Sequence, residues 1–73
     1  MRVLFNKSLY SRKAIREAIK GFEDFARLKQ KTEGNYYVVE GEPIASDVNT
    51  EELEGEFINY CLGLVVAERG QKI

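Results

Sequence analysis

The stretch RLKQKTEGNYYVVEGEP, residues 27–43, consists of two β-prone runs joined by the dipeptide Gly-Asn. A two-residue loop of this kind joins neighbouring antiparallel strands, with Gly34 at a position that needs positive φ. The loop also sets the register, so Glu33 is expected to lie opposite Tyr36. Pro43 has no N–H to donate and is expected to end the pairing. The sequence therefore predicts a β-hairpin as the centre of the fold.

This register divides the side chains of the hairpin between two faces. Leu28, Tyr37 and Val39 are expected to share the face that packs on helices, because alternate residues of a strand point the same way. Lys29 and Glu40 are expected to face each other on the open side and to form a cross-strand ion pair.

Two further elements are predicted before the hairpin. Residues 2–6, RVLFN, are apolar and β-prone and indicate a strand. Residues 9–26, LYSRKAIREAIKGFEDFA, indicate an amphipathic helix with Ser11 as its N-cap. Its apolar residues recur at spacings of three and four and form one stripe: Ala14, Ile15, Ala18, Ile19, Phe22, Phe25 and Ala26.

After the hairpin, a polar connection leads into a final helix that is expected to run to about Arg69. Asn49 with Glu52 makes a possible capping box, and Thr50 is the competing cap. The predicted order is strand, helix, strand, strand, helix. This order predicts one α+β domain over residues 1–73, a two-layer sandwich with both helices on one face of a small sheet.

The final helix is apolar on more than one side. One stripe is an ordinary core face, made by Leu53, Phe57, Tyr60, Cys61, Leu64 and Val65. A second stripe consists of Ile58, Leu62 and Val66, with Ala67 at its edge. Either the first helix covers this second stripe within the monomer, or part of it is buried by a second copy or by another protein. A homodimer or docking to another protein is the leading expectation.

Composition excludes several classes of function. The chain has 73 residues, a formal net charge of -1, no histidine and a single cysteine, Cys61. No phosphate-binding loop, metal-ligand spacing or nucleophile with a plausible base is present, so we expect no enzyme, no metal and no cofactor. No run of apolar residues is long enough to cross a bilayer, and a cytoplasmic protein with no membrane contact is expected.

Single-stranded nucleic acid is the alternative partner. Lys29, Lys31 and Tyr36 are expected on the open face of the hairpin, and basic groups beside an aromatic ring can neutralise and stack a single strand. Glu33 and Glu40 share that face and weaken the case.

Several local features together resemble a known family. They are an Asn-Lys strand end, a Tyr-Ser helix start, an aromatic and acidic helix end, a short hairpin, and an acid-Phe-x-Asn helix with an apolar run. Here these are Asn6 and Lys7, Tyr10 and Ser11, Phe22 with Asp24, Tyr36 to Val39, and Glu56, Phe57 and Asn59. The chain resembles the small D component of His-Xaa-Ser peptide maturation systems. The resemblance implies an accessory protein without known catalysis, which works beside radical enzymes that modify a short repeated peptide.

Overall fold

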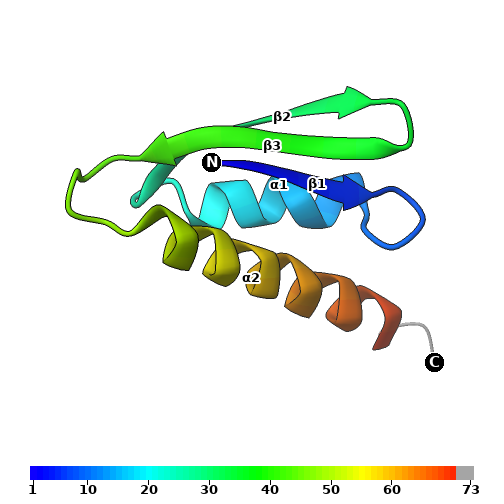
Figure 1. The fold of residues 1–73 in the computed structure, drawn as a ribbon. Coiled ribbons are helices and arrows are strands. Elements are labelled where there is room, and N and C mark those ends of the chain that lie inside the picture. Colours follow the sequence, from blue (N-terminus) through cyan, green and yellow to red (C-terminus); the bar gives the residue numbers. More distant parts are fainter. Residues whose placement is uncertain (71–73) are drawn as a thin grey trace.

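The computed structural model describes residues 1–70 and contains three strands and two helices (Figure 1). The elements are β1 (Arg2–Asn6), α1 (Arg12–Gly21), β2 (Ala26–Glu33), β3 (Tyr36–Pro43) and α2 (Thr50–Gly70). The strands form one antiparallel sheet in the order β1-β3-β2. Both helices lie on the same side of this sheet (Figure 1). The predicted α+β fold and its β-α-β-β-α order are confirmed.

The register of the hairpin is also as predicted. Glu33 lies opposite Tyr36, Pro43 is the last residue of β3, and Gly34 in the loop has a φ of 58°. Glycine adopts this left-handed conformation without the steric cost that other residues carry.

Alternate residues of the central strand β3 form backbone hydrogen bonds to β1 on one side and to β2 on the other. Met1 and Gly41 exchange backbone hydrogen bonds of 2.8 and 3.1 Å, and the Lys7 N–H donates to the Asn35 carbonyl at 3.0 Å. Odd-numbered residues of β1 therefore bond to β3, and the backbone groups of Arg2 and Leu4 point outward from the free edge. The same alternation leaves the backbone groups of Gln30 and Thr32 on the free edge of β2.

The core lies between the sheet and the helices. Phe57 of α2 is fully buried, and its ring packs edge-on against Phe5 and Phe22 with centroids 6.0 and 5.3 Å away. Edge-to-face packing of this kind adds stability beyond the buried area. The residues of the core cluster are Val3, Phe5, Ile15, Ala18, Phe22, Ala26, Val39, Leu53, Phe57 and Cys61.

The first helix begins as predicted but ends earlier. The Ser11 side chain accepts a hydrogen bond from the Ala14 N–H at 3.0 Å, which confirms the N-cap. The helix ends at Gly21, and a tight turn leads into β2 at Ala26. The Phe22 carbonyl accepts hydrogen bonds from the N–H groups of Phe25 and Ala26, both at 2.9 Å, and these bonds stabilise the turn. The apolar spacing continues past the helix because Phe22 and Ala26 are buried in the core, but Phe25, predicted in the same stripe, is 61% exposed.

Candidate partner-binding surface

One face of α2 forms the core and is close to the prediction. Asn49 caps the helix, because its side chain accepts the Glu52 N–H at 3.1 Å and the helix begins at Thr50. The buried residues of the helix are Leu53, Phe57, Cys61 and Val65, and Leu64 packs against the core while remaining partly exposed.

Tyr60 departs from this core stripe. Its side chain is 45% exposed, although the ring packs edge-on against Phe22 at 5.4 Å. A Cβ built on Gly21 would lie 3.1 Å from the Tyr60 hydroxyl, so the ring covers the end of α1. A tyrosine can bury its ring edge while its hydroxyl stays in water, which is why periodicity alone placed it inside. Tyr60 thus marks the side of α2 that faces α1.

The second stripe of α2 lies largely outside the monomer. Leu62 is 47% and Val66 60% exposed, whereas Ile58 is partly buried against the core. At about 100° per residue, Leu62 and Val66 lie about 140° and 180° around the helix from Phe57. Ala67 is exposed too, but it lies on the side of Tyr60 rather than on the side of Ile58. The first helix therefore does not cover Leu62 and Val66.

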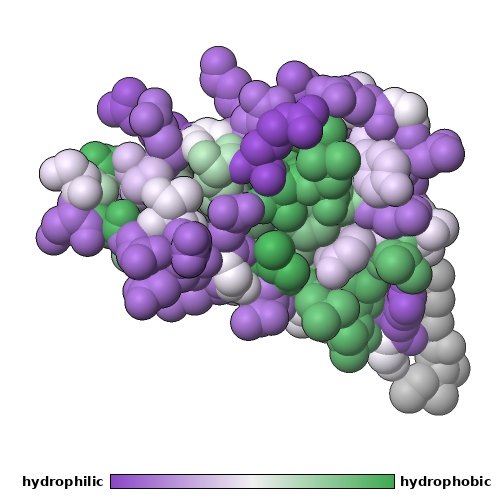
Figure 2. Space-filling view, viewed as in Figure 1, coloured by the Kyte–Doolittle hydropathy of each residue, from purple (hydrophilic) through white to green (hydrophobic). Residues whose placement is uncertain are grey.

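This exposed stripe adjoins the free edge of β1. Ile58 and Leu62 lie on the flank of α2 away from α1, and α1 packs on β2, at the opposite edge of the sheet from β1. Figure 2 shows apolar surface from the β1 region down over the second half of α2. Leu9, 56% exposed, extends it beside the end of α2, where the Arg69 guanidinium donates to the Leu9 carbonyl at 3.1 Å. We call this surface, made of the outer edge of β1 with Leu9, Ile58, Leu62 and Val66, the α2 face.

Two glycines in α2 have no role within the monomer. A Cβ built on Gly55 or Gly63 would meet nothing within 4 Å. Glycine inside a helix costs about 1 kcal/mol relative to alanine. Small residues on a helix surface let a second backbone approach closely. Gly55 lies between Leu62 and Val66 around the helix and is compatible with another helix packing there, whereas Gly63 lies nearer to Ala67.

The open face of the sheet carries a charged quartet rather than a free basic patch. Arg2 and Lys31 alternate with Glu33 and Glu40, with nitrogen to oxygen distances of 2.9 to 3.4 Å. These four side chains surround Val38, which points to this face and is fully buried. Hydrogen bonds to Glu40 and then Glu33 raise the pKa of Lys31, and the hydrogen bond from Lys31 lowers the pKa of both carboxyl groups.

The quartet changes the expectation for the residues proposed to bind nucleic acid. Lys29 lies opposite Glu40 as predicted, but in the described part of the chain Glu40 pairs with Lys31 and Arg2 instead. Arg2 reaches Glu40 from β1 and Lys31 reaches it from β2, so two cations already satisfy this carboxylate. Tyr36 is 41% exposed at the end of the strand. Lys31 already donates to two carboxylates, and their negative charge disfavours a phosphate beside it.

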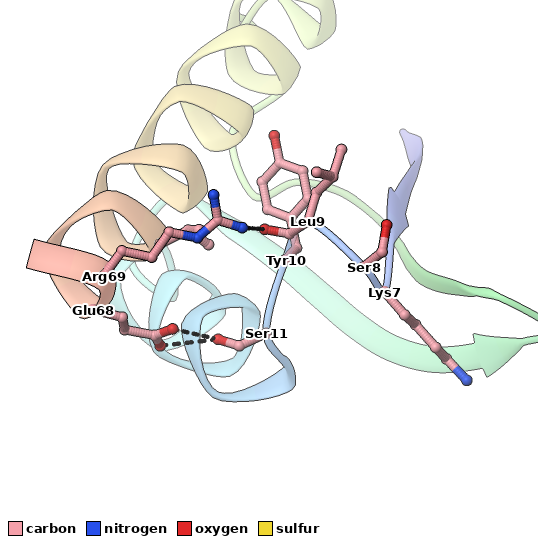
Figure 3. Close-up of a pocket in the computed structure, with 8 residues that line it drawn as sticks. Lys7, Ser8, Leu9, Tyr10, Ser11, Glu68 and Arg69 are labelled. Atoms are coloured by element: carbon pink, nitrogen blue, oxygen red, sulfur yellow. Dashed lines mark hydrogen bonds between the residues drawn. The ribbon is translucent and has the colours of Figure 1, made fainter. Parts of the chain in front are cut away.

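A shallow hollow of about 220 Å³ lies where the loop before α1 meets the end of α2 (Figure 3). The Ser11 hydroxyl donates to Glu68, with both carboxylate oxygens at 2.9 Å. Ser11 also caps α1, so this one side chain joins the start of α1 to the end of α2. Figure 3 shows Glu68 and Arg69 directed at this loop. The contacts hold the ends of the two helices together.

Replacement of Ser11 by alanine tests this junction. The change removes the cap on the Ala14 N–H and the partner of Glu68 together, and each loss is worth about 1 kcal/mol. We expect Ser11→Ala to lower the free energy of unfolding by about 2 kcal/mol in urea titrations followed by circular dichroism. Ser8→Ala is the control, since the side-chain hydrogen bond of Ser8 goes to Asn6, two residues away at the end of β1. Equal stability of the two variants would show that the Ser11 side chain does not stabilise the contact between the two helix ends.

Cys61 is a structural residue. It is fully buried in the core, and burial raises the pKa of its thiol to about 12. The nucleophilic thiolate is therefore scarce at neutral pH. We expect Cys61 to resist iodoacetamide in native buffer and to react at the rate of a free thiol in 6 M guanidinium, measured by mass spectrometry. Rapid labelling of the folded protein would show that this part of the core opens.

Residues 1–70 contain no group of three or more side chains suited to hold a metal ion. Over the same residues, no helix has the length and apolar character needed to cross a membrane. Comparison of the chain with family models, with curated proteins and with solved structures gave no match in any of the three. The α2 face and the sequence resemblance are therefore the two features that bear on function.

Proposed function

We propose that this protein is a small non-enzymatic accessory protein that acts by association through the α2 face. The observation that carries the proposal is the exposure of Leu62 and Val66, opposite the core side of an otherwise well-packed helix. Exposed apolar patches beside a free strand edge are typical of protein interfaces. The occupant we propose is a second copy of the chain.

The geometry of the β1 edge favours a two-fold arrangement. In an antiparallel β1 pair centred on Leu4, the outward N–H and carbonyl of Leu4 would meet their counterparts in the second copy. Arg2 would then lie opposite Asn6, so no like charges face each other. The other edge of the sheet, β2, carries Arg27, Lys29 and Lys31 against one acidic residue, Glu33, so two such edges would bring an excess of positive charge together. The charges thus select β1 for self-association.

The same two-fold axis would bring the two α2 helices together in antiparallel orientation. The acidic first half, with Glu51, Glu52, Glu54 and Glu56, would approach the end that carries Arg69. Antiparallel helix dipoles also attract weakly. A stable interface buries about 800 Å² per partner, which is about 15% of the 5227 Å² accessible surface of the chain. A 21-residue helix and a strand edge can supply this area.

Replacement of Leu62 by glutamate tests the proposal. We expect the wild type to sediment as a dimer at about 100 μM and Leu62→Glu to sediment as a folded monomer, because the new charge would be buried in the interface. Ile44→Glu is the control, since Ile44 is 52% exposed in the connection before α2 and should leave the dimer intact. A monomeric wild type would overturn the proposal that a second copy occupies the face.

Amide hydrogen exchange provides a second measurement. We expect the Leu4 N–H to be protected in the wild type and to exchange freely in Leu62→Glu, since no acceptor in the described chain lies on that edge. The Val3 N–H, which points to β3, should stay protected in both proteins. Free exchange of Leu4 in a dimeric wild type would exclude β1 pairing.

The proposed biological setting is the maturation of a His-Xaa-Ser peptide, as the resemblance to the D component implies. In that setting the protein would assist a radical enzyme without itself performing chemistry. The test is whether a purified radical enzyme encoded beside this chain binds the wild type. Absence of binding would contradict a role in peptide maturation. The proposed self-association would still be tested by sedimentation and hydrogen exchange.

A further inference from the structure

A second hollow lies away from the α2 face, between α1 and the free edge of β2. Its volume is about 360 Å³. Arg12 and Arg16 line it from α1, and Gln30 and Thr32 line it from β2, with Ile19 and Leu28 completing the wall. Arg12 and Arg16 are one helical turn apart and therefore lie on the same side of α1.

The two side chains that α1 contributes to the polar lining of this hollow, Arg12 and Arg16, can only donate hydrogen bonds, whereas Gln30 and Thr32 can donate and accept. Within residues 1–70, neither Arg12 nor Arg16 forms an ion pair, and no carboxylate lines the hollow. Lys31 contributes to the wall, but its amine is held on the other face of the sheet by Glu33 and Glu40. The two guanidinium groups thus have no negative partner here, whereas the cations of the charged quartet have two each.

Gln30 adds an independent observation. Its side-chain Nε2 is buried and has no hydrogen-bond partner in the described chain. Leaving such a donor unsatisfied is costly, and buried polar groups in folded proteins nearly always have a partner. The missing partner must be an acceptor, because an amide nitrogen can only donate. The outward backbone N–H groups of Gln30 and Thr32 lie on the same edge, beside the outward carbonyls of the same two residues.

We infer that this hollow binds an oxyanion, the phosphate or carboxylate group of a ligand. Guanidinium groups match both groups by paired hydrogen bonds. The Gln30 amide would contribute a neutral donor from the other side, and the Thr32 hydroxyl can donate as well. This site is separate from the α2 face, so the inference does not depend on the proposed association.

Nuclear magnetic resonance titration with inorganic phosphate, and separately with citrate, tests the inference at constant ionic strength. We expect saturable shifts of the Gln30 side-chain amide and of the Thr32 backbone amide. Binding of phosphate or of citrate would identify the preferred oxyanion. Arg12→Gln and Arg16→Gln should each weaken binding about tenfold, the effect of losing one charge-assisted contact.

Lys13→Gln is the matched control, because it removes the same charge from the same end of α1 without touching the hollow. It should change the affinity less than twofold. Gln30→Met keeps the shape of the side chain but removes the donor, and it should weaken binding several-fold while the protein stays folded. The inference is overturned if neither anion shifts the Gln30 amide at about 10 mM. It is equally overturned if Lys13→Gln weakens binding as much as Arg16→Gln, since the effect would then be general charge.

Discussion

Gly41→Ala is expected to destabilise the fold by about 3 kcal/mol or more. A Cβ built on Gly41 would lie 1.9 Å from the Arg27 carbonyl oxygen and 2.9 Å from its carbon. These are backbone atoms of the neighbouring strand, so the overlap cannot be relieved by rotating a side chain. Separating the strands would weaken the hairpin on which both helices pack. Thermal and urea unfolding followed by circular dichroism would measure the loss.

Gly34→Ala is the matched control for this prediction. Gly34 has the left-handed φ of 58°, but a Cβ there would meet nothing within 4 Å. Its replacement should cost only about 1 kcal/mol, the conformational penalty of that backbone region. If Gly41→Ala lowered the free energy of unfolding no more than Gly34→Ala, the Arg27 backbone would not lie as close to Gly41 as the structure shows.

Phe57→Ala is expected to cost about 3–5 kcal/mol. Phe57 is fully buried and joins both layers, since its ring packs on Phe5 of β1 and on Phe22 after α1. Its removal would leave a cavity that two rigid neighbouring rings cannot fill. In a domain of this size such a loss is a large part of the total stability, and a substantial unfolded population is expected at 37 °C.

Phe25→Ala supplies the comparison with the same residue type. Phe25 lies in the turn between α1 and β2 and is 61% exposed. Its replacement should change the free energy of unfolding by about 0.5 kcal/mol or less. A similar cost at both positions would mean that Phe57 does not occupy the centre of the core. The two variants therefore separate burial from the general effect of losing a ring.

The sequence by itself determined the order of the elements, the register of the hairpin and the start of α1, and it limited the cap of α2 to Asn49 or Thr50. Each depends on local chemistry: a Gly-Asn loop with one favourable geometry, and Ser11 and Asn49 as caps that accept a backbone N–H. The predicted end of α1 was wrong by about five residues, because the apolar spacing continues into a turn in which Phe22 and Ala26 are buried.

Only the tertiary structure decided which apolar and charged groups are free. Leu62 and Val66 follow the same period as the core residues, and their exposure depends on where α1 packs. Lys31 and Arg16 are both basic residues in regular elements, yet one is held by two carboxylates and the other has no ion pair in the described chain. Such differences arise from neighbours distant in sequence, which local spacing does not specify.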